Sequence, residues 1–479
     1  MASNQSRDVL LEDNHDFLPA SPTSEYINSS VLSLSILGVF EIETPIDDSP
    51  TIELLREQFL PINNRFSSIL IRDGNGAQRW KKVDIRLEDH VKVPHFPTGL
   101  PPATYDEYLQ EYLSKIALDR LPENRPLWEI HLIKYPTSDA AGTVVFKLHH
   151  ALGDGFSLMG ALFSCLKRAD DPSLPLTFPT YSTKSTTSST SHRMSDTCKK
   201  VSTIAAGCWY TASDFVQSVL HSTVLQDDHT AIRSGTPLVE FEPVTISSVT
   251  FSLDRIREIK SKISGTVNDV AVGIIFYAIQ LYQQRMGQIS PGRRMTALVL
   301  LNTRMVNGYQ CVEDMLKEKT WGNHFTFLQI AIPSSDNAEK ENPLAFLLKA
   351  KKTIKRKRHS LAVYLNGRLV QMLRTIRGPE AASRYIHATM KNTTTGISYL
   401  VGPMEKMEMG DLPVKSFYFS VVGVPQSLAL TMVSYMGNLR VVASAEKRFI
   451  NSQLLMSCMK EAYDKVHREA CGVDGTESQ

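Results

Sequence analysis

Residues 143–166 constrain the fold more than any other part of the chain, because they predict a strand, a sharp turn and a helix in succession. Thr143–Leu148 has the apolar and β-branched residues of a strand, and Phe156–Leu166 has the spacing of a helix. Side chains alternate between the two faces of a strand. We therefore expect the adjacent residues His149 and His150 to point to opposite faces of a sheet.

Two glycines follow this histidine pair. Gly153 and Gly155 allow the chain to turn sharply before the expected helix, because glycine tolerates conformations that other residues avoid. The turn places His150 at the carboxyl end of a strand, where sheets of α/β proteins open their clefts.

Strands and helices mix in both halves of the chain without a strict β-α alternation. This pattern predicts the α/β class with mixed sheets. The expected strands are 30–43, 66–71, 80–83, 127–133, 143–148, 296–301, 325–332, 416–422, 429–434 and 439–443, with helices at 51–60, 105–118, 156–166, 267–285 and 451–466.

Changes in composition divide the chain into four regions. Residues 1–20 are polar and acidic, and we expect them to be disordered. Residues 21–180 form a first lobe. Residues 181–243 begin with a stretch of Ser, Thr and Lys that is typical of a linker, and they contain an apolar segment at about 201–225. Residues 244–479 form a second lobe.

Composition excludes several classes of function. The net charge of +2 gives no polyelectrolyte signal for nucleic acid. The six cysteines show no C-x-x-C spacing, which favours reduced thiols facing the cytosol. There is no H-E-x-x-H, and Gly155–Met159 lacks the last glycine of a serine-hydrolase elbow. His149 and His150 point apart and cannot easily share one metal, so we expect no metal site.

A histidine at the end of this strand can carry acyl-transfer chemistry. An alcohol that attacks a thioester must lose its proton as the new bond forms, and histidine titrates near neutral pH. A positioned base contributes roughly 100 to 10,000-fold in rate. We predict that His150 is this general base and that His149 is structural. Asp154 either caps the helix at Phe156 or orients His150, and the two roles are compatible.

The run His149-His150-x-x-x-Asp154-Gly155 is the HHxxxDG signature of chloramphenicol acetyltransferase-like enzymes, plant acyl-CoA-dependent acyltransferases and peptide-synthetase condensation domains. The surrounding residues narrow the resemblance, which runs from about Ser21 to Val466. The chain most resembles the plant bifunctional wax ester synthase/diacylglycerol acyltransferase family, in the runs at residues 28–33, 125–129, 147–155 and 266–270.

The resemblance implies a two-lobed chloramphenicol acetyltransferase-like fold with an active-site tunnel between the lobes. Acyl-CoA would enter one mouth as a substrate, so no cofactor is expected, and a fatty alcohol or diacylglycerol would enter the other. His150 matches the family's catalytic histidine and Asp154 its mainly structural aspartate. The expected products are wax esters, triacylglycerol or both. Tyr399 replaces the asparagine of the family's Ser-Asn-Val-x-Gly-Pro run, which puts any polar role at that position in doubt.

The transition state also needs donors for a developing oxyanion. Because the base comes from the first lobe, we look for them mainly in the second. Asn268, which matches a family position, and Ser398 are the candidates there. Gly155 is a third candidate for substrate binding.

Two alternatives to lipid acylation remain at this point. The same fold can acylate a soluble phenolic or amine acceptor, or it can bind lipid without catalysing a reaction. An intact His150 and Asp154 argue against the second alternative.

Two segments suggest a membrane surface as a partner. Val201–Leu225 contains Asp214 and many hydroxyls, so its own residues favour an interfacial amphipathic helix, whereas the resemblance favours a single pass. Lys349–Arg358 holds seven basic residues, which fit either a solvated helix face or attraction to anionic headgroups or CoA phosphates. We expect the endoplasmic reticulum membrane with a cytosolic active site, and the plasma membrane is the alternative.

Overall fold

The computed structural model describes residues 17–72, 78–179, 209–288, 292–304, 311–334, 337, 342–358 and 360–472. The expected disordered N-terminus up to residue 16, the hairpin turn at 73–76, the Ser/Thr-rich stretch at 181–195 and the first part of the 201–225 segment lie outside the described residues.

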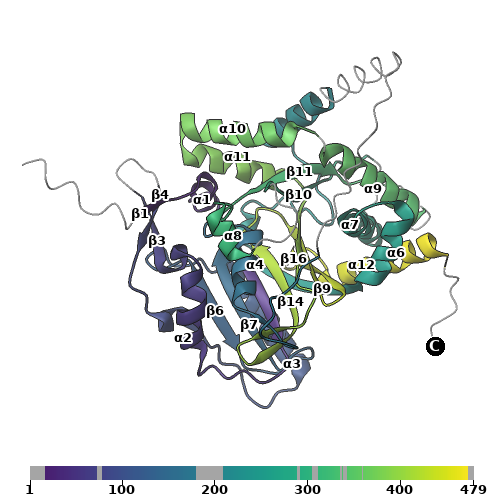
Figure 1. Cartoon of the computed structure of the whole chain (residues 1–479). Coiled ribbons are helices and arrows are strands. Elements are labelled where there is room, and N and C mark those ends of the chain that lie inside the picture. Colours follow the sequence, from purple (N-terminus) through teal and green to yellow (C-terminus); the bar gives the residue numbers. More distant parts are fainter. Residues whose placement is uncertain are drawn as a thin grey trace, which may run out of the picture.

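Two large sheets organise the molecule, and a small third sheet of three strands flanks the first (Figure 1). The first sheet has seven strands in the order β5 (Val91–Lys92), β6 (Trp128–Ile133), β7 (Gly142–His149), β2 (Ser35–Ile42), β14 (Leu412–Val422), β13 (Met407–Met409) and β8 (Lys167–Arg168). The small sheet consists of β1 (Phe17–Pro19), β4 (Gln78–Lys82) and β3 (Ser68–Arg72). Residues 17–19 are therefore ordered, although they fall in the segment expected to be disordered.

The second sheet is mixed, as the sequence predicts. Its six strands run in the order β11 (Phe325–Ala331), β10 (Thr296–Asn302), β12 (Thr395–Val401), β15 (Leu428–Tyr435), β16 (Asn438–Glu446) and β9 (Val244–Ser252). β12 is parallel to both β10 and β15, while the other pairs are antiparallel.

The sheets do not divide at residue 244, where the sequence suggested a boundary. β14 comes from the second half of the chain but pairs with β2 of the first sheet, with Phe419 opposite Gly38. The chain then turns at Gly423, whose φ of +82° favours glycine, and enters β15 of the second sheet. This exchange ties the two halves together, because the first sheet is incomplete without residues 407–422.

Helices cover the second sheet on the side away from the first. α7 (Val267–Arg285) is buried on nearly all sides among α6 (Leu253–Ile263), α9 (Pro343–Arg358) and α12 (Ser452–Cys471) (Figure 1). Thr266 and Asp269 form a capping box at its start, and its bounds match the expected helix. Gly273 lets α9 approach closely, because a Cβ there would overlap the side chain of Leu347.

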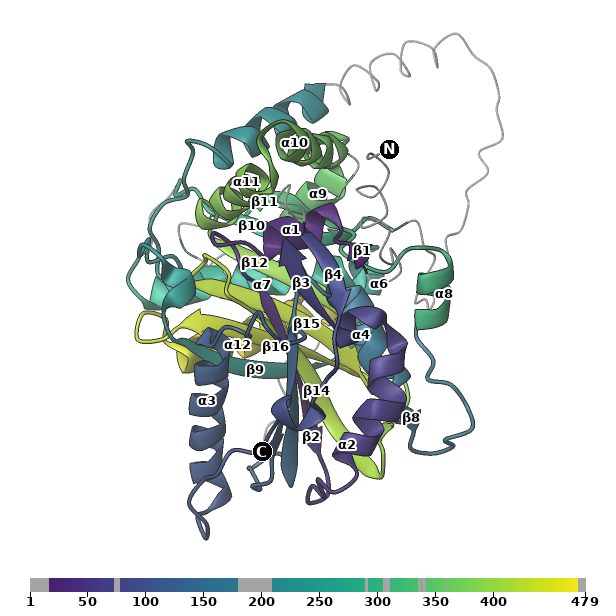
Figure 2. The same cartoon turned by 90° about the vertical axis from the view of Figure 1, so that its left-hand side faces the viewer.

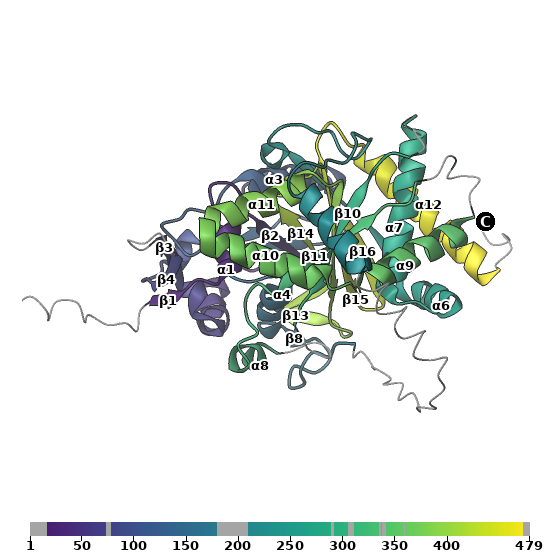
Figure 3. The same ribbon diagram turned by 90° about the horizontal axis from the view of Figure 1, so that it is seen from above.

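The remaining helices lie at the edges of the sheets. α3 (Pro102–Leu118) and α2 (Thr51–Leu54) flank the first sheet, α4 (Gly155–Ser164) follows β7, and α8 (Val312–Lys317) packs against α4 at the outer edge of the molecule (Figure 2). α10 (Ala362–Arg377) and α11 (Pro379–Lys391) form an antiparallel pair beside α1 (Pro22–Ile27). Residues 209–221 form one more helix next to α10 (Figure 3).

Within the described residues, every single helix is too short or too polar to cross a bilayer. α6 and α7 reach the required length and apolar character only when taken together, and they meet at a bend of 98°.

Candidate active site

The strand-turn-helix expected at the histidine pair is formed by β7 and α4. β7 ends at His149, and the backbone N–H of His150 donates to the carbonyl of Leu34 at 2.9 Å. Asp154 caps α4 by accepting from the backbone N–H of Ser157 at 3.0 Å. A Cβ at Gly153 would lie 3.0 Å from the Cβ of Ser157, so the turn requires a small residue there.

Both ring nitrogens of His149 have protein partners. Nδ1 accepts from the backbone N–H of Ala151 at 3.1 Å, so the proton is on Nε2, which donates to Ser33 Oγ at 3.1 Å. Burial lowers the pKa of His149 to about 3. The ring is therefore neutral and fully engaged, which fits a structural role.

His150 has one engaged nitrogen and one open nitrogen. Asn323 Nδ2 donates to the backbone carbonyl of His150 at 2.9 Å, which fixes the amide so that its Oδ1 lies 2.8 Å from His150 Nδ1. Nδ1 must then carry the proton and donate it, because an amide oxygen only accepts. Nε2 keeps its lone pair and makes no hydrogen bond within the described residues.

Electrostatics favour the neutral form of His150. Burial lowers its pKa from the ordinary value, and the nearby charge of Asp154 and the Asn323 hydrogen bond oppose this effect only in part. A neutral imidazole with a free Nε2 can accept a proton at neutral pH.

Asn323 is held in place from both sides. The carbonyl of Gly322 accepts from the backbone N–H of Asp154 at 3.1 Å, and the backbone N–H of His324 donates to Asp154 Oδ2 at 2.9 Å. The φ of Gly322 is +127°, a conformation that favours glycine. Asp154 thus fixes both neighbours of the residue that sets the proton position on His150.

Arg304 completes this polar cluster. Its Nη1 and Nη2 donate to the two oxygens of Asp154 at 2.7 and 3.0 Å, and the two side chains are only 1% and 6% exposed. Nη2 also donates to the carbonyl of Gly322 at 2.8 Å. Among the described contacts, Asp154 makes no hydrogen bond to His150, so it orients His150 only through Asn323.

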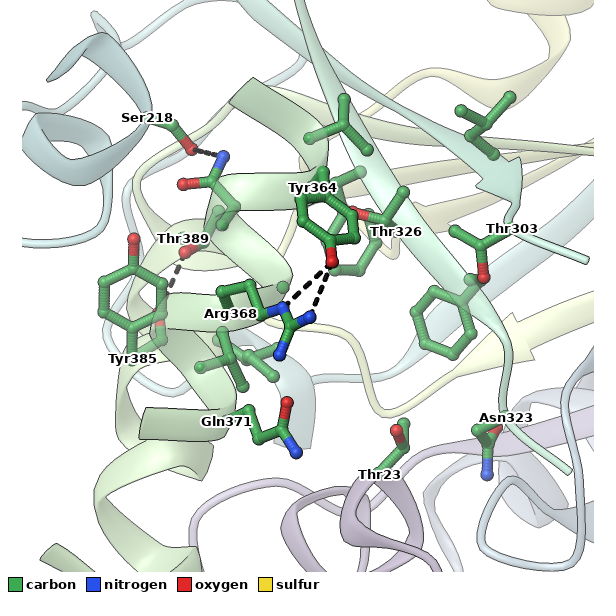
Figure 4. A pocket seen from close by; sticks show the side chains of 18 of the residues that line it. Thr23, Ser218, Thr303, Asn323, Thr326, Tyr364, Arg368, Gln371, Tyr385 and Thr389 are labelled. Atoms are coloured by element: carbon green, nitrogen blue, oxygen red, sulfur yellow. Dashed lines mark hydrogen bonds between the residues drawn. The ribbon is translucent and has the colours of Figure 1, made fainter. Parts of the chain in front are cut away.

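Each residue of the His150–Asn323 pair lines a different cavity. The histidine cavity, of about 300 Å³, lies between the two sheets and is lined by residues of both, among them His150, Phe419 and Ser398. The α10 cavity, of about 740 Å³, is lined by Asn323 and by residues of α10 and α11 (Figure 4). Phe325 lines both cavities, and its ring lies edge-to-face with His150 at 5.4 Å.

The structure places two of the three predicted substrate-binding residues beside His150. Ser398 and Gly155 line the histidine cavity, and a Cβ at Gly155 would meet only open space. Tyr399 lines the same cavity and packs against the core of the second lobe. Asn268 does not fit the expected role, because it lies in the first turn of α7 and lines neither cavity.

A possible metal-binding group lies away from both cavities. Glu258, His467 and Cys471 approach one another on α6 and α12, and His467 Nε2 is 2.8 Å from Glu258 Oε2. None of the three lines either of the two cavities, so the group has no place in the site described here.

Comparison with known proteins identifies the family. The family model described as the wax ester synthase/diacylglycerol acyltransferase catalytic domain matches residues 51–271, and the WS/DGAT C-terminal domain matches residues 321–467. Wax ester synthase/diacylglycerol acyltransferase 5 from Arabidopsis thaliana is 29% identical over 459 residues, covering 90% of each chain. Wax ester synthase/diacylglycerol acyltransferase 4 from the same plant is 28% identical over 456 residues, covering 90% of this chain and 86% of the relative.

Solved structures support the fold. The wax ester synthase/diacylglycerol acyltransferase from Marinobacter aquaeolei VT8 superimposes with a TM-score of 0.59 at 16% identity, over 95% of this chain and all of that one. The first condensation domain of the CDA synthetase gives a TM-score of 0.51 at 11% identity, over 91% and 90% of the two chains. The two-lobed fold expected from the HHxxxDG signature is confirmed, and this chain belongs to the wax ester synthase/diacylglycerol acyltransferase family of acyltransferases.

Proposed function

We propose that this acyltransferase esterifies long-chain fatty alcohols, diacylglycerol or both from acyl-CoA, with His150 as general base. The observation that carries the proposal is the hydrogen bond from His150 Nδ1 to Asn323 Oδ1, which leaves Nε2 as the proton acceptor in a cavity between the sheets. The substrate classes follow from the similarity to wax ester synthase/diacylglycerol acyltransferases 5 and 4 of Arabidopsis thaliana.

The reaction is a direct transfer in a ternary complex. The alcohol donates its proton to His150 Nε2 while its oxygen attacks the thioester carbonyl carbon. The C–O bond forms, and His150 becomes an imidazolium whose Nδ1–H is stabilised by Asn323. The tetrahedral intermediate then expels CoA as a thiolate, which takes the proton from Nε2 and leaves as the thiol. No covalent enzyme intermediate is needed.

Donors for the oxyanion are available in the histidine cavity. Ser398 lines this cavity and carries a hydroxyl donor, and Gly155 lies in the first turn of α4, where backbone N–H groups lack partners within the helix. We assign Ser398 and the amino end of α4 to the developing negative charge.

We place the enzyme at a membrane, with the endoplasmic reticulum as the first choice and the plasma membrane as the second. Fatty alcohols and diacylglycerol partition into bilayers, so an enzyme that uses them benefits from a membrane-facing cavity. The active site would lie on the cytosolic side, which agrees with the four described cysteines being unpaired.

An acceptor panel tests the proposal. Purified full-length chain is incubated with labelled palmitoyl-CoA and either hexadecanol, dioleoylglycerol, or a soluble phenol or amine, and the products are separated as neutral lipids. We expect wax ester, triacylglycerol or both, with the soluble acceptors at background. Label appearing only with a soluble acceptor would overturn the lipid assignment, and the absence of any product would favour a lipid-binding protein.

A further inference from the structure

The helix at residues 209–221 has its polarity reversed relative to a helix packed on an apolar core. Its polar residues Asp214, Ser218 and His221 are buried. Trp209, Val216 and Leu220, which are spaced along one face, are exposed, Trp209 by 73%. Large apolar side chains gathered on one exposed face are unusual for a surface in contact with water only.

Polar contacts fix this orientation. Asp214 forms an ion pair with Lys357 of α9 at 2.6 Å, and Arg356 approaches the same carboxylate at 3.6 Å. Ser218 Oγ accepts from Asn366 Nδ2 of α10 at 2.7 Å. Because these polar contacts hold one face of the helix against α9 and α10, its apolar face remains directed outward.

These contacts refine the expectation for the basic run at 349–358, in which five of the seven basic residues are exposed, as a solvated helix face requires. The run was expected to be a solvated face or a headgroup-binding cluster. Two residues of the run depart from this expectation: Lys357 is buried and paired with Asp214, and Lys351 donates to the carbonyl of Ser264 at 3.0 Å. Lys349, Lys352 and Lys355 are exposed.

α10 carries a second outward apolar stripe. Leu361, Leu365, Met372 and Ile376 follow the spacing i, i+4, i+11 and i+15, which places them on one face of a helix, and all four are exposed. Figure 3 shows α10 and the helix at 209–221 on the side of the molecule that faces the viewer, and Figures 1 and 2 show both at its top. We call the two stripes together the apolar platform.

The segment that carries most of the platform is rich in basic residues. From Pro343 to Pro379 the chain has ten Lys and Arg residues and no Asp or Glu. Four of them, Arg356, Lys357, Arg358 and Arg374, pair with acidic residues of other segments, and the others leave an excess of positive charge. The one charged side chain of residues 209–221 is Asp214, which is neutralised by Lys357. A second copy of this chain would meet the platform with like charge, whereas an anionic surface is complementary.

The α10 cavity reaches the surface at the platform. Leu361 and Tyr364 line this cavity and are also exposed, and Arg368, which lines it too, donates to the Tyr364 hydroxyl (Figure 4). A lipid that leaves a bilayer beside α10 would therefore enter the α10 cavity. Its hydroxyl would then pass Phe325, which lines both cavities, to reach His150 Nε2 in the histidine cavity.

We propose that the apolar platform docks on an anionic bilayer surface and that the lipid alcohol enters the α10 cavity from this bilayer. The inference rests on the proposed function, because it specifies how that site receives its acceptor. It assigns α10, rather than the 201–225 segment alone, as part of the membrane contact.

Tryptophan fluorescence tests the contact directly. The chain has four tryptophans, all among the described residues, and Trp80, Trp128 and Trp321 are at most 8% exposed. Vesicles of phosphatidylcholine and phosphatidylserine should shift the emission to shorter wavelength by acting on Trp209. The shift should be absent in Trp209→Phe, smaller with pure phosphatidylcholine, and reduced by salt. An unchanged spectrum with anionic vesicles would overturn the proposal.

Charged substitutions on the exposed face of α10 test whether this helix contacts the bilayer. Met372 and Ile376, which are 51% and 72% exposed, line neither cavity, and Leu316 on α8 provides a matched exposed control at 43%. We expect Met372→Glu/Ile376→Glu to weaken binding to anionic vesicles by about tenfold or more, because binding scales with buried apolar area. Leu316→Glu should bind like the wild type. Equal binding by the α10 variant, or an equal loss in the control, would contradict the docking assignment.

Activity measurements separate this proposal from the proposed function. The rate with dioleoylglycerol in vesicles should fall in the α10 variant, while the rate with a dissolved short-chain alcohol should stay at the wild-type value. If the α10 variant is equally slow with the dissolved alcohol, the platform does not act through the membrane. If the wild type makes no ester with any alcohol but binds vesicles, the proposed function fails and the docking surface stands.

Discussion

Within the HHxxxDG motif, His149 and Asp154 differ from His150 in how many of their polar side-chain atoms are hydrogen-bonded. His149 and Asp154 use their polar side-chain atoms in contacts with Ser33, Ala151, Ser157, His324 and Arg304. His150, in the same turn, uses Nδ1 and keeps Nε2 open in a cavity.

This difference separates support from chemistry. A buried polar group whose hydrogen bonds are satisfied holds a structure in place, because breaking any one of them leaves a costly unpaired group. A buried nitrogen that faces a cavity with its lone pair free is available to a substrate. We therefore expect substitutions of His149 or Asp154 to lower stability more than rate, and substitutions of His150 to lower rate more than stability.

The largest effect is expected for His150→Ala. Losing the general base should lower kcat by roughly 100 to 10,000-fold. Thermal unfolding should change far less. The matched variant His149→Gln should show the opposite pattern, with a lower Tm and a smaller loss of rate. If both variants lost rate equally at unchanged Tm, the division of roles between the two histidines would be wrong.

Arg304→Gln should mainly destabilise the fold. It leaves the Asp154 carboxylate buried without its ionic partner, and breaking such a pair costs about 3–5 kcal/mol. Urea unfolding measures this cost directly.

Asp154→Asn keeps an acceptor for the helix cap, so its rate should fall less than that of His150→Ala. A rate loss as large as that of His150→Ala at wild-type stability would make Asp154 a direct participant.

Asn323→Asp should shift the pH dependence of the reaction. A carboxylate beside Nδ1–H stabilises the imidazolium and raises the pKa of His150. Because the neutral ring is the base, the acid limb of kcat/KM should move to higher pH, with the largest loss of rate at and below neutral pH. Asn323→Leu cannot fix the proton on Nδ1, so it should lose rate at every pH. A profile that matches the wild type would contradict the role of Asn323.

Gly155→Ala should give the smallest effect. Its new methyl group would point into open space in the histidine cavity, so the rate should fall a few-fold while stability changes by less than about 1 kcal/mol. Gly153→Ala is the control, because its Cβ would press on Ser157 and should lower Tm. The reverse pattern would mean that Gly153, and not Gly155, borders the substrate.

Local patterns in the sequence predicted ten strands, five helices and the position of His150, whereas β9, β12, α6 and α11 were not expected. The helix at 267–285 has the expected bounds, and the strands at 127–133 and 296–301 differ by about a residue, since apolar periodicity is a local signal. The helix at 362–377 was not predicted. Its apolar residues point to solvent, so they do not form the pattern of a helix packed on a core.

Contacts between distant parts of the chain were not predictable in this way. Asn323 lies 173 residues from His150 and Arg304 lies 150 residues from Asp154, and no local pattern connects them. The Gly322–Asn323 pair immediately before a strand could have indicated a functional turn, because glycine and asparagine favour turns and the amide can form hydrogen bonds. The pairing of β14 with the first sheet depends on the whole fold. In the sequence, residues 412–422 look like any other strand of the second half of the chain, so the pattern does not reveal the sheet to which they belong.

The central claim is that a neutral His150, with its lone pair on Nε2, accepts the proton of the alcohol. Its most direct test is the pH dependence of kcat/KM for CoA release, measured with palmitoyl-CoA and hexadecanol for the wild type and for His150→Ala. The wild type should lose rate in acid with an inflection below 6.5, since burial lowers the pKa of this histidine from that value. The residual rate of His150→Ala should lack this inflection. The same inflection in both proteins would show that another group is the base and would contradict the account.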